Sequence, residues 1–140
     1  MRSAITHLVC SRCGTPYGAD EKVTMCHNED DGRLDVFYDL EMAKETLTKE
    51  IVQERPGGVW RYVELLPVQD QRDIITLNEG NTPLLKCEKI GRELGLRELY
   101  VKDETRNPTA SFKDRAMTVG VSKAIEFRAE TVVSASTGNA

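Results

Sequence analysis

A lysine stands next to a helix-start signal in the second half of the chain. Ser111, with Asp114 three residues later, forms a capping-box pattern, so we expect a helix to begin here. Lys113 then falls in the first helical turn, where unpaired backbone N–H groups and the helix dipole disfavour a cation. A lysine amine that readily becomes neutral can form a Schiff base with an aldehyde. The alternative is an ordinary surface lysine on a helix.

A loop of small hydroxyl residues follows an expected strand at residues 131–133. Ser136, Thr137 and Asn139 lie in this loop. If the strand belongs to a parallel sheet, the loop lies at its carboxyl end, where open α/β sheets bind ligands. Small side chains with a glycine suit the binding of a carboxylate or phosphate. The alternative is a turn with no function.

Three cysteines occur close together near the start of the chain. Cys10 and Cys13 form a CxxC knuckle, and twelve residues separate Cys13 from Cys26. This layout predicts a zinc ribbon, although Glu29 occupies the position where a second CxxC pair would have its last cysteine. His27 or Glu29 would complete a tetrahedral site, because zinc accepts nitrogen and oxygen ligands. A ribbon without metal is the alternative.

The chain divides into three parts that would position these residues. Residues 1–38 are rich in turn formers, hold the cysteine cluster and end in an alternating strand. Residues 39–73 form a helical arm that begins after the N-cap Asp39. Residues 74–140 read as the beginning of a further domain.

This last part alternates strands and helices. A strand at residues 99–102, a helix at residues 112–129 and a strand at residues 131–133 form a βαβ unit. Since two strands joined by a helix run in the same direction, we expect an α/β fold with a parallel sheet.

Composition narrows the classes of partner. The chain has 140 residues, 19 Lys and Arg against 23 Asp and Glu, and a net charge of −4. That balance argues against a nucleic-acid or membrane partner, and no apolar run is long enough to span a bilayer. The clustered cysteines do not resemble a disulfide scaffold, and no secretory signal precedes them, so we expect a cytoplasmic protein.

The motifs together resemble one enzyme family. Residues 107–115 are similar to the lysine motif of fold type II pyridoxal-phosphate enzymes, whose fold is that of the tryptophan synthase β chain. Residues 79–84 and 136–139 resemble two further segments of that family. Residues 1–38 and 58–62 are typical of its threonine synthase branch. The resemblance implies the start of a parallel sheet, preceded by a zinc-ribbon-like segment.

The resemblance also implies roles for single residues. Lys113 would bind pyridoxal phosphate through its amine and move protons as general base and acid. Asn139 would hydrogen-bond the ring hydroxyl oxygen of the cofactor, and Ser136 and Thr137 would bind the α-carboxylate of the substrate. Threonine synthases are lyases that convert O-phospho-L-homoserine and water to threonine and phosphate. The expected partner is thus a small amino-acid phosphate, and the full-length enzyme would form homo-oligomers.

Other readings remain open. Cysteate synthase and threonine dehydratase share the fold, and a zinc-ribbon binding module without catalysis is a reading of another class. Ala110 and Ala116 occupy positions where glycines are common around the family's lysine. The sequence stops at Ala140 within the substrate loop, so we expect an N-terminal piece of a longer enzyme that is inactive by itself.

Overall fold

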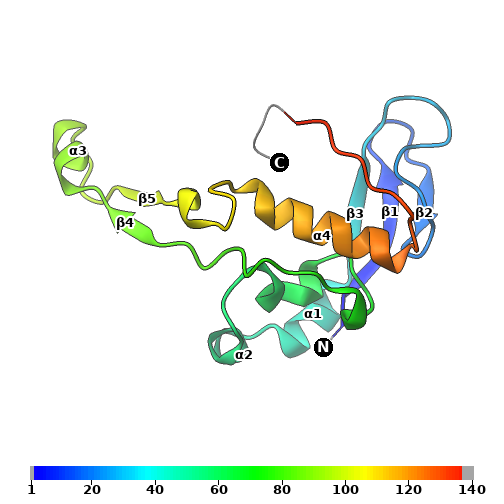
Figure 1. The fold of residues 1–140 in the computed structure, drawn as a ribbon, viewed down its shortest axis with the longest axis horizontal. Helices are drawn as coiled ribbons and strands as arrows, with labels where there is room; N and C mark the ends of the chain where they lie inside the picture. Colours follow the sequence, from blue (N-terminus) through cyan, green and yellow to red (C-terminus); the bar gives the residue numbers. More distant parts are fainter. Residues whose placement is uncertain (1, 137–140) are drawn as a thin grey trace.

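The computed structural model describes residues 2–136 and shows a mixed α/β chain with two small sheets (Figure 1). The first sheet has the order β2-β1-β3 and consists of β1 (Ile5–Cys10), β2 (Pro16–Gly18) and β3 (Leu34–Tyr38). Both neighbours pair with β1 in the antiparallel direction, with Leu8 opposite Tyr17 on one side and Val36 on the other. The predicted strand at the end of the first part is therefore confirmed as β3.

The arm that follows is made of short helices, namely α1 (Leu40–Thr46), α2 (Lys49–Glu54), η1 (Val59–Leu65) and η2 (Gln71–Asp73). The predicted N-cap is confirmed, because a side-chain oxygen of Asp39 accepts the backbone N–H of Met42 at 2.9 Å. A second cap at Thr48, whose hydroxyl accepts the N–H of Ile51, starts a new helix. Two caps in ten residues explain why the arm is broken into separate pieces.

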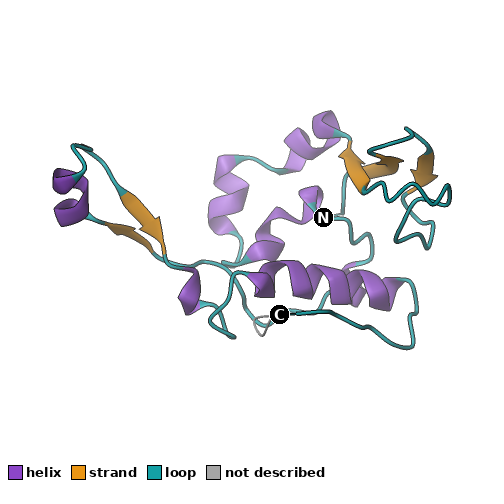
Figure 2. Cartoon of the chain, turned by 90° about the horizontal axis from the view of Figure 1, so that it is seen from above, coloured by secondary structure: helices purple, strands orange, loops and turns teal. Residues whose placement is uncertain are grey.

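The last part contains β4 (Leu84–Lys86), α3 (Glu88–Glu93), β5 (Tyr100–Lys102), η3 (Glu104–Arg106) and α4 (Lys113–Glu126). β4 and β5 form an antiparallel ribbon with α3 at its tip, and this unit extends away from the rest of the chain (Figures 1 and 2). Apolar side chains on it stay exposed, including Leu84 at 61% and Leu94 at 64%.

The expected parallel sheet is not formed within residues 2–136. β5 pairs with β4 in the antiparallel direction, and residues 131–133 form no strand. Val133 is 88% exposed, and residues 131–133 pair with no strand in the described part of the chain. The predicted βαβ unit was wrong for these residues, although the strand and the helix at its start are confirmed as β5 and α4.

Helix α4 is the element that joins the three parts. Near its end, the Lys123 ammonium donates to the carbonyl of Ala19 in the first part and to that of Pro67 in the arm. One residue earlier, the fully buried Ser122 hydroxyl accepts the backbone N–H of Ile75 at 2.8 Å. Anchored in this way, α4 presents its N-terminus at the opposite end. No helix in residues 2–136 is both long and apolar enough to cross a membrane.

Candidate active site at the start of helix α4

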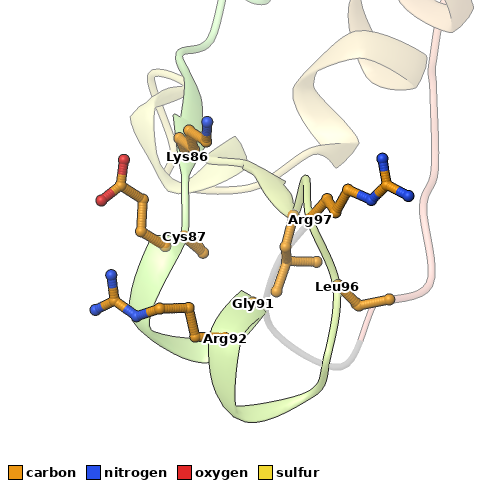
Figure 3. Close-up of a pocket in the computed structure, with 8 residues that line it drawn as sticks. Lys86, Cys87, Gly91, Arg92, Leu96 and Arg97 are labelled. Carbon is orange, nitrogen blue, oxygen red and sulfur yellow. The ribbon is translucent and has the colours of Figure 1, made fainter.

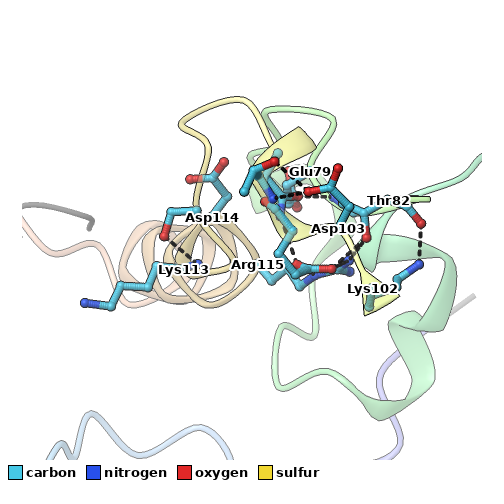
Figure 4. Close-up of polar contacts among 12 residues, drawn as sticks. Glu79, Thr82, Lys102, Asp103, Lys113, Asp114 and Arg115 are labelled. Carbon is cyan, nitrogen blue, oxygen red and sulfur yellow. Dashed lines mark hydrogen bonds and ion pairs between the residues drawn. The ribbon is translucent and has the colours of Figure 1, made fainter. Parts of the chain in front are cut away.

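Lys113 is the first residue of α4 and so lies in the first turn as predicted, but the N-cap position is held by Phe112 without a side-chain cap, one residue after the predicted Ser111. The hydroxyl of Ser111 accepts the backbone N–H of Lys113 at 3.2 Å and so satisfies one of the unpaired donors at the helix start. The Lys113 side chain is half-buried and extends away from the neighbouring cluster of acidic and basic groups (Figure 4).

The loop before Lys113 is held by a buried carboxylate. Asp114 is 4% exposed and accepts both the backbone N–H of Thr109, at 2.9 Å, and the hydroxyl of the same residue. Ala110, between Thr109 and Asp114 in the sequence, has a φ of 57°, a left-handed conformation that costs alanine energy. Its N–H bonds to the carbonyl of Asn107 at 2.8 Å, so the turn is tight.

An ion pair ties this loop to the preceding η3 helix. The Arg115 guanidinium contacts Glu104 at 2.8 Å through Nε and at 2.9 Å through Nη2. Thr82 and Asn107 donate to the same carboxylate at 2.6 and 2.9 Å. The Arg115 guanidinium, and after it the Thr82 hydroxyl, lower the pKa of Glu104 to about 2. Glu104 therefore stays ionised and keeps all three partners at physiological pH.

Glu79 connects α4 to the segment before β4. It is 1% exposed and accepts hydrogen bonds from the Thr118 hydroxyl at 2.7 Å, and from Thr76 and the Leu77 N–H, both at 2.9 Å. The next residue, Gly80, donates its N–H to the side chain of Asn107 at 2.8 Å. The two motifs at residues 79–84 and 107–115, separate in the sequence, are thus packed into one polar network.

Gly58 gives a direct test of this packing. Its φ of 111° and ψ of −179° lie in a region that is essentially restricted to glycine, and a Cβ there would come 2.9 Å from the Glu79 carbonyl oxygen. We expect Gly58→Ala to lower the free energy of unfolding by about 2–3 kcal/mol, as measured by urea denaturation. Gly95→Ala is the matched control, because Gly95 also has a positive φ but a Cβ there would touch nothing within 4 Å. Equal losses in the two variants would contradict the proposed close contact.

The predicted substrate and cofactor loop is described only in part. Thr137 and Asn139 lie outside the described residues. Ser136 is exposed, at the end of a segment that leaves α4 and runs back beside it in both views (Figures 1 and 2). The loop and Lys113 are therefore joined by one helix and the segment that returns along it.

A pocket of about 300 Å³ lies elsewhere, in the unit formed by β4, α3 and β5 (Figure 3). Lys86, Arg92 and Arg97 contribute to its lining, and Gly91 forms part of its floor. It contains none of the predicted site residues. This pocket is therefore separate from the region around Lys113.

The cysteines form a second cluster, in the first part of the chain. Cys10, Cys13 and Cys26 offer sulfurs that lie, together with a carboxylate oxygen of Asp30, within 4.8 Å of one another. Cys10 and Cys26 are buried, at 2% and 6% exposure. The three cysteines predicted as ligands are therefore brought together.

The fourth group differs from the two that the sequence suggested. Neither His27 nor Glu29 belongs to the cluster in the described structure, and Asp30 takes that place. The His27 ring packs edge-on against Tyr17 with ring centroids 5.2 Å apart, and the backbone N–H of His27 donates to the Tyr17 hydroxyl. Glu29 is exposed and has a φ of 51°, so the chain turns at this residue and presents Asp30 to the sulfurs.

Known proteins similar to this chain agree with the motifs. A family model described as pyridoxal-phosphate dependent enzyme matches residues 75–140. A threonine synthase of Methanocaldococcus jannaschii is 50% identical over 130 residues, which are 93% of this chain and 32% of that protein. A threonine synthase of Methanosarcina acetivorans is 49% identical over 95% of this chain and 32% of its own length, and that of Halalkalibacterium halodurans is 48% identical over 59% and 23%.

This chain thus spans about a third of the length of the first two relatives. The matched family region contains β4, the polar network and Lys113 at the start of α4. The motifs, their packing and these comparisons agree: the chain is similar to pyridoxal-phosphate-dependent enzymes over residues 75–140 and to threonine synthases over most of its length.

Proposed function

We propose that this chain is the lysine-bearing part of a threonine synthase, which converts O-phospho-L-homoserine and water to threonine and phosphate. The observation that carries the proposal is the identity of 50% with a threonine synthase over 93% of the chain, in a region that includes Lys113. Residues 1–38 and 39–73 would be a ribbon-like segment and an arm, and residues 74–140 the beginning of the catalytic domain. We further propose a cytoplasmic location and a homo-oligomeric full-length enzyme.

The residues around Lys113 fit an aldehyde cofactor. A primary amine is required, and Lys113 provides it from a helix start whose position is fixed by Ser111. Two carboxylates of this region have partners of their own. Asp114 binds Thr109, and Glu104 binds Arg115.

In this proposal Lys113 has two tasks. Its amine would hold the aldehyde of pyridoxal phosphate, and the free amine would move protons between carbons of the substrate. The cofactor, when bound, supplies an electron sink for carbanions. Ser136 and Thr137 would bind the α-carboxylate of the substrate, and Asn139 the ring hydroxyl oxygen of the cofactor.

Two measurements on the full-length, cofactor-loaded protein test the proposal. Borohydride reduction fixes the link between lysine and cofactor, and peptide mapping should find the label on Lys113. The protein should then release phosphate from O-phosphohomoserine. Release from O-phosphoserine alone would instead identify a cysteate synthase, and a label on another lysine would refute the role of Lys113.

A further inference from the structure

We propose that Cys10, Cys13, Cys26 and Asp30 form a binding site for one zinc ion that stabilises the first part of the chain. The proposal rests on the geometry of these four side chains and is independent of the proposed catalytic function. Sequence spacing suggested His27 or Glu29 as the fourth ligand, whereas the structure brings Asp30 to the three sulfurs.

The distances within the cluster are close to those of a tetrahedral set of ligand atoms. Zinc–sulfur bonds of about 2.3 Å and zinc–oxygen bonds of about 2.1 Å at tetrahedral angles place the ligands about 3.6–3.8 Å apart. The sulfurs of Cys13 and Cys26 are 3.5 Å apart, and the Cys10 sulfur lies 3.3 and 3.5 Å from the two Asp30 oxygens. A disulfide would need about 2.05 Å between sulfurs. The cluster therefore has the size of a metal site.

Two backbone turns direct N–H groups at the sulfurs. The N–H of Arg12 points at the Cys10 sulfur at 3.4 Å, and the N–H of Asn28 points at the Cys26 sulfur at 3.5 Å. In each case the donor lies two residues after the cysteine. The Tyr17 hydroxyl also contacts the Cys26 sulfur, at 3.2 Å. Such donors around the ligands orient them and stabilise their thiolate form.

Asp30 is held in place by a glycine that nothing larger could replace. The N–H of Gly32 donates to one Asp30 oxygen at 2.8 Å. A Cβ on Gly32 would lie 2.2 Å from the Cys10 sulfur and 2.8 Å from the same Asp30 oxygen. The loop therefore closes directly over the cluster, and a side chain at this position would displace two of the four ligands.

The donor set selects the ion. Three thiolates disfavour Mg²⁺ and Ca²⁺, which prefer oxygen ligands, and the tetrahedral spacing with one oxygen suits Zn²⁺. All four positions are occupied by protein side chains, so the site is closed and structural rather than catalytic. It joins the end of β1 to the loop before β3, and it adds a cross-link where the sheet has only a small core of Cys10, Tyr17 and Cys26.

Metal analysis of the full-length protein, purified under reducing conditions, tests the proposal first. We expect about one zinc ion per chain. Asp30→Ala should bind zinc on the order of 100-fold more weakly, because losing even an outer-shell partner costs about 10- to 100-fold. Asp31→Ala and Cys87→Ser are the matched controls, and both should bind as tightly as the unchanged protein.

Cobalt spectroscopy gives a second test that does not depend on weakened binding. Co²⁺ in the site should show thiolate charge-transfer absorption together with the visible bands of tetrahedral coordination. Asp30→Cys should raise the charge-transfer intensity by about one third as a fourth thiolate replaces the oxygen, whereas Asp31→Cys should leave it unchanged. A protein without metal, a disulfide between Cys13 and Cys26, or equal spectra for the two cysteine variants would overturn the proposal.

Discussion

Replacing Lys113 with alanine is expected to lower the rate of phosphate release from O-phosphohomoserine by about a thousandfold or more in the full-length enzyme. The change removes the amine that we propose both holds the cofactor and moves protons, and proton transfer alone contributes about 10²- to 10⁴-fold. Stability should change little, because the backbone N–H of Lys113 still donates to Ser111 and the side chain is only half-buried. Steady-state kinetics and thermal unfolding of the same sample separate the two effects.

The matched control is Lys89→Ala, a change of the same chemistry at an exposed position in α3. It should leave both activity and borohydride labelling unchanged. If Lys113→Ala kept activity comparable to Lys89→Ala, or lost activity only because it unfolded, the proposed role of Lys113 would be wrong.

Local signals explain why this region was predictable. A helix start depends on a few residues close in sequence, so Ser111 and Asp114 were sufficient to predict α4. The same holds for Asp39, whose cap was predicted and found. What the sequence did not reveal is how the loop is supported, because Glu79 and Thr118 are 39 residues apart and meet only in the folded chain.

Asp30 shows why the fourth member of the cysteine cluster could not be predicted from the sequence. Counting from a CxxC pattern places the last ligand at Glu29, which assumes ordinary turn geometry after Cys26. In the structure Glu29 and Asp31 both have positive φ values, of 51° and 53°, and Asp30 between them faces the sulfurs. Left-handed residues other than glycine leave little trace in a sequence, so a shift of one position could not be foreseen.

The strand predicted at residues 131–133 is not formed, for another reason. Thr131, Val132 and Val133 have the β-branched composition of a strand, but a strand also needs a partner for its backbone hydrogen bonds. Within residues 2–136, β5 already pairs with β4, and no strand lies beside this segment. The composition therefore indicated a strand, but the described part of the chain provides no partner strand for its backbone hydrogen bonds.

Glu64 carries the largest expected effect on stability. Its side chain is 2% exposed and pairs with Arg55, itself 7% exposed, at 2.6 Å. Thr46 donates a further hydrogen bond at 2.9 Å, so the pair joins α1, the end of α2 and η1. Glu64→Gln leaves the Arg55 charge buried without compensation, and we expect the free energy of unfolding to fall by about 3–5 kcal/mol. Urea denaturation followed by circular dichroism measures this loss.

The same pair predicts how stability depends on pH. Hydrogen bonds from Arg55 lower the pKa of Glu64 from 4.5 to about 2 in the folded chain. A carboxyl whose pKa is lower in the folded than in the unfolded state stabilises the fold above the unfolded value. That contribution is lost as the pH falls from about 4.5 towards 2. Glu64→Gln should therefore lose stability less steeply than the unchanged protein across this range.

A double substitution separates the charge from the packing. Removing both partners in Arg55→Met with Glu64→Leu leaves no buried charge unpaired, and such replacements are often neutral or stabilising. We therefore expect the double variant to recover most of the loss seen in Glu64→Gln. Glu41→Gln is the exposed control, since its pair with Lys44 lies at the surface and should contribute at most about 1 kcal/mol. If Glu64→Gln cost no more than Glu41→Gln, the buried pair would not be what holds the arm together, and packing around Val63 would have to supply that stability.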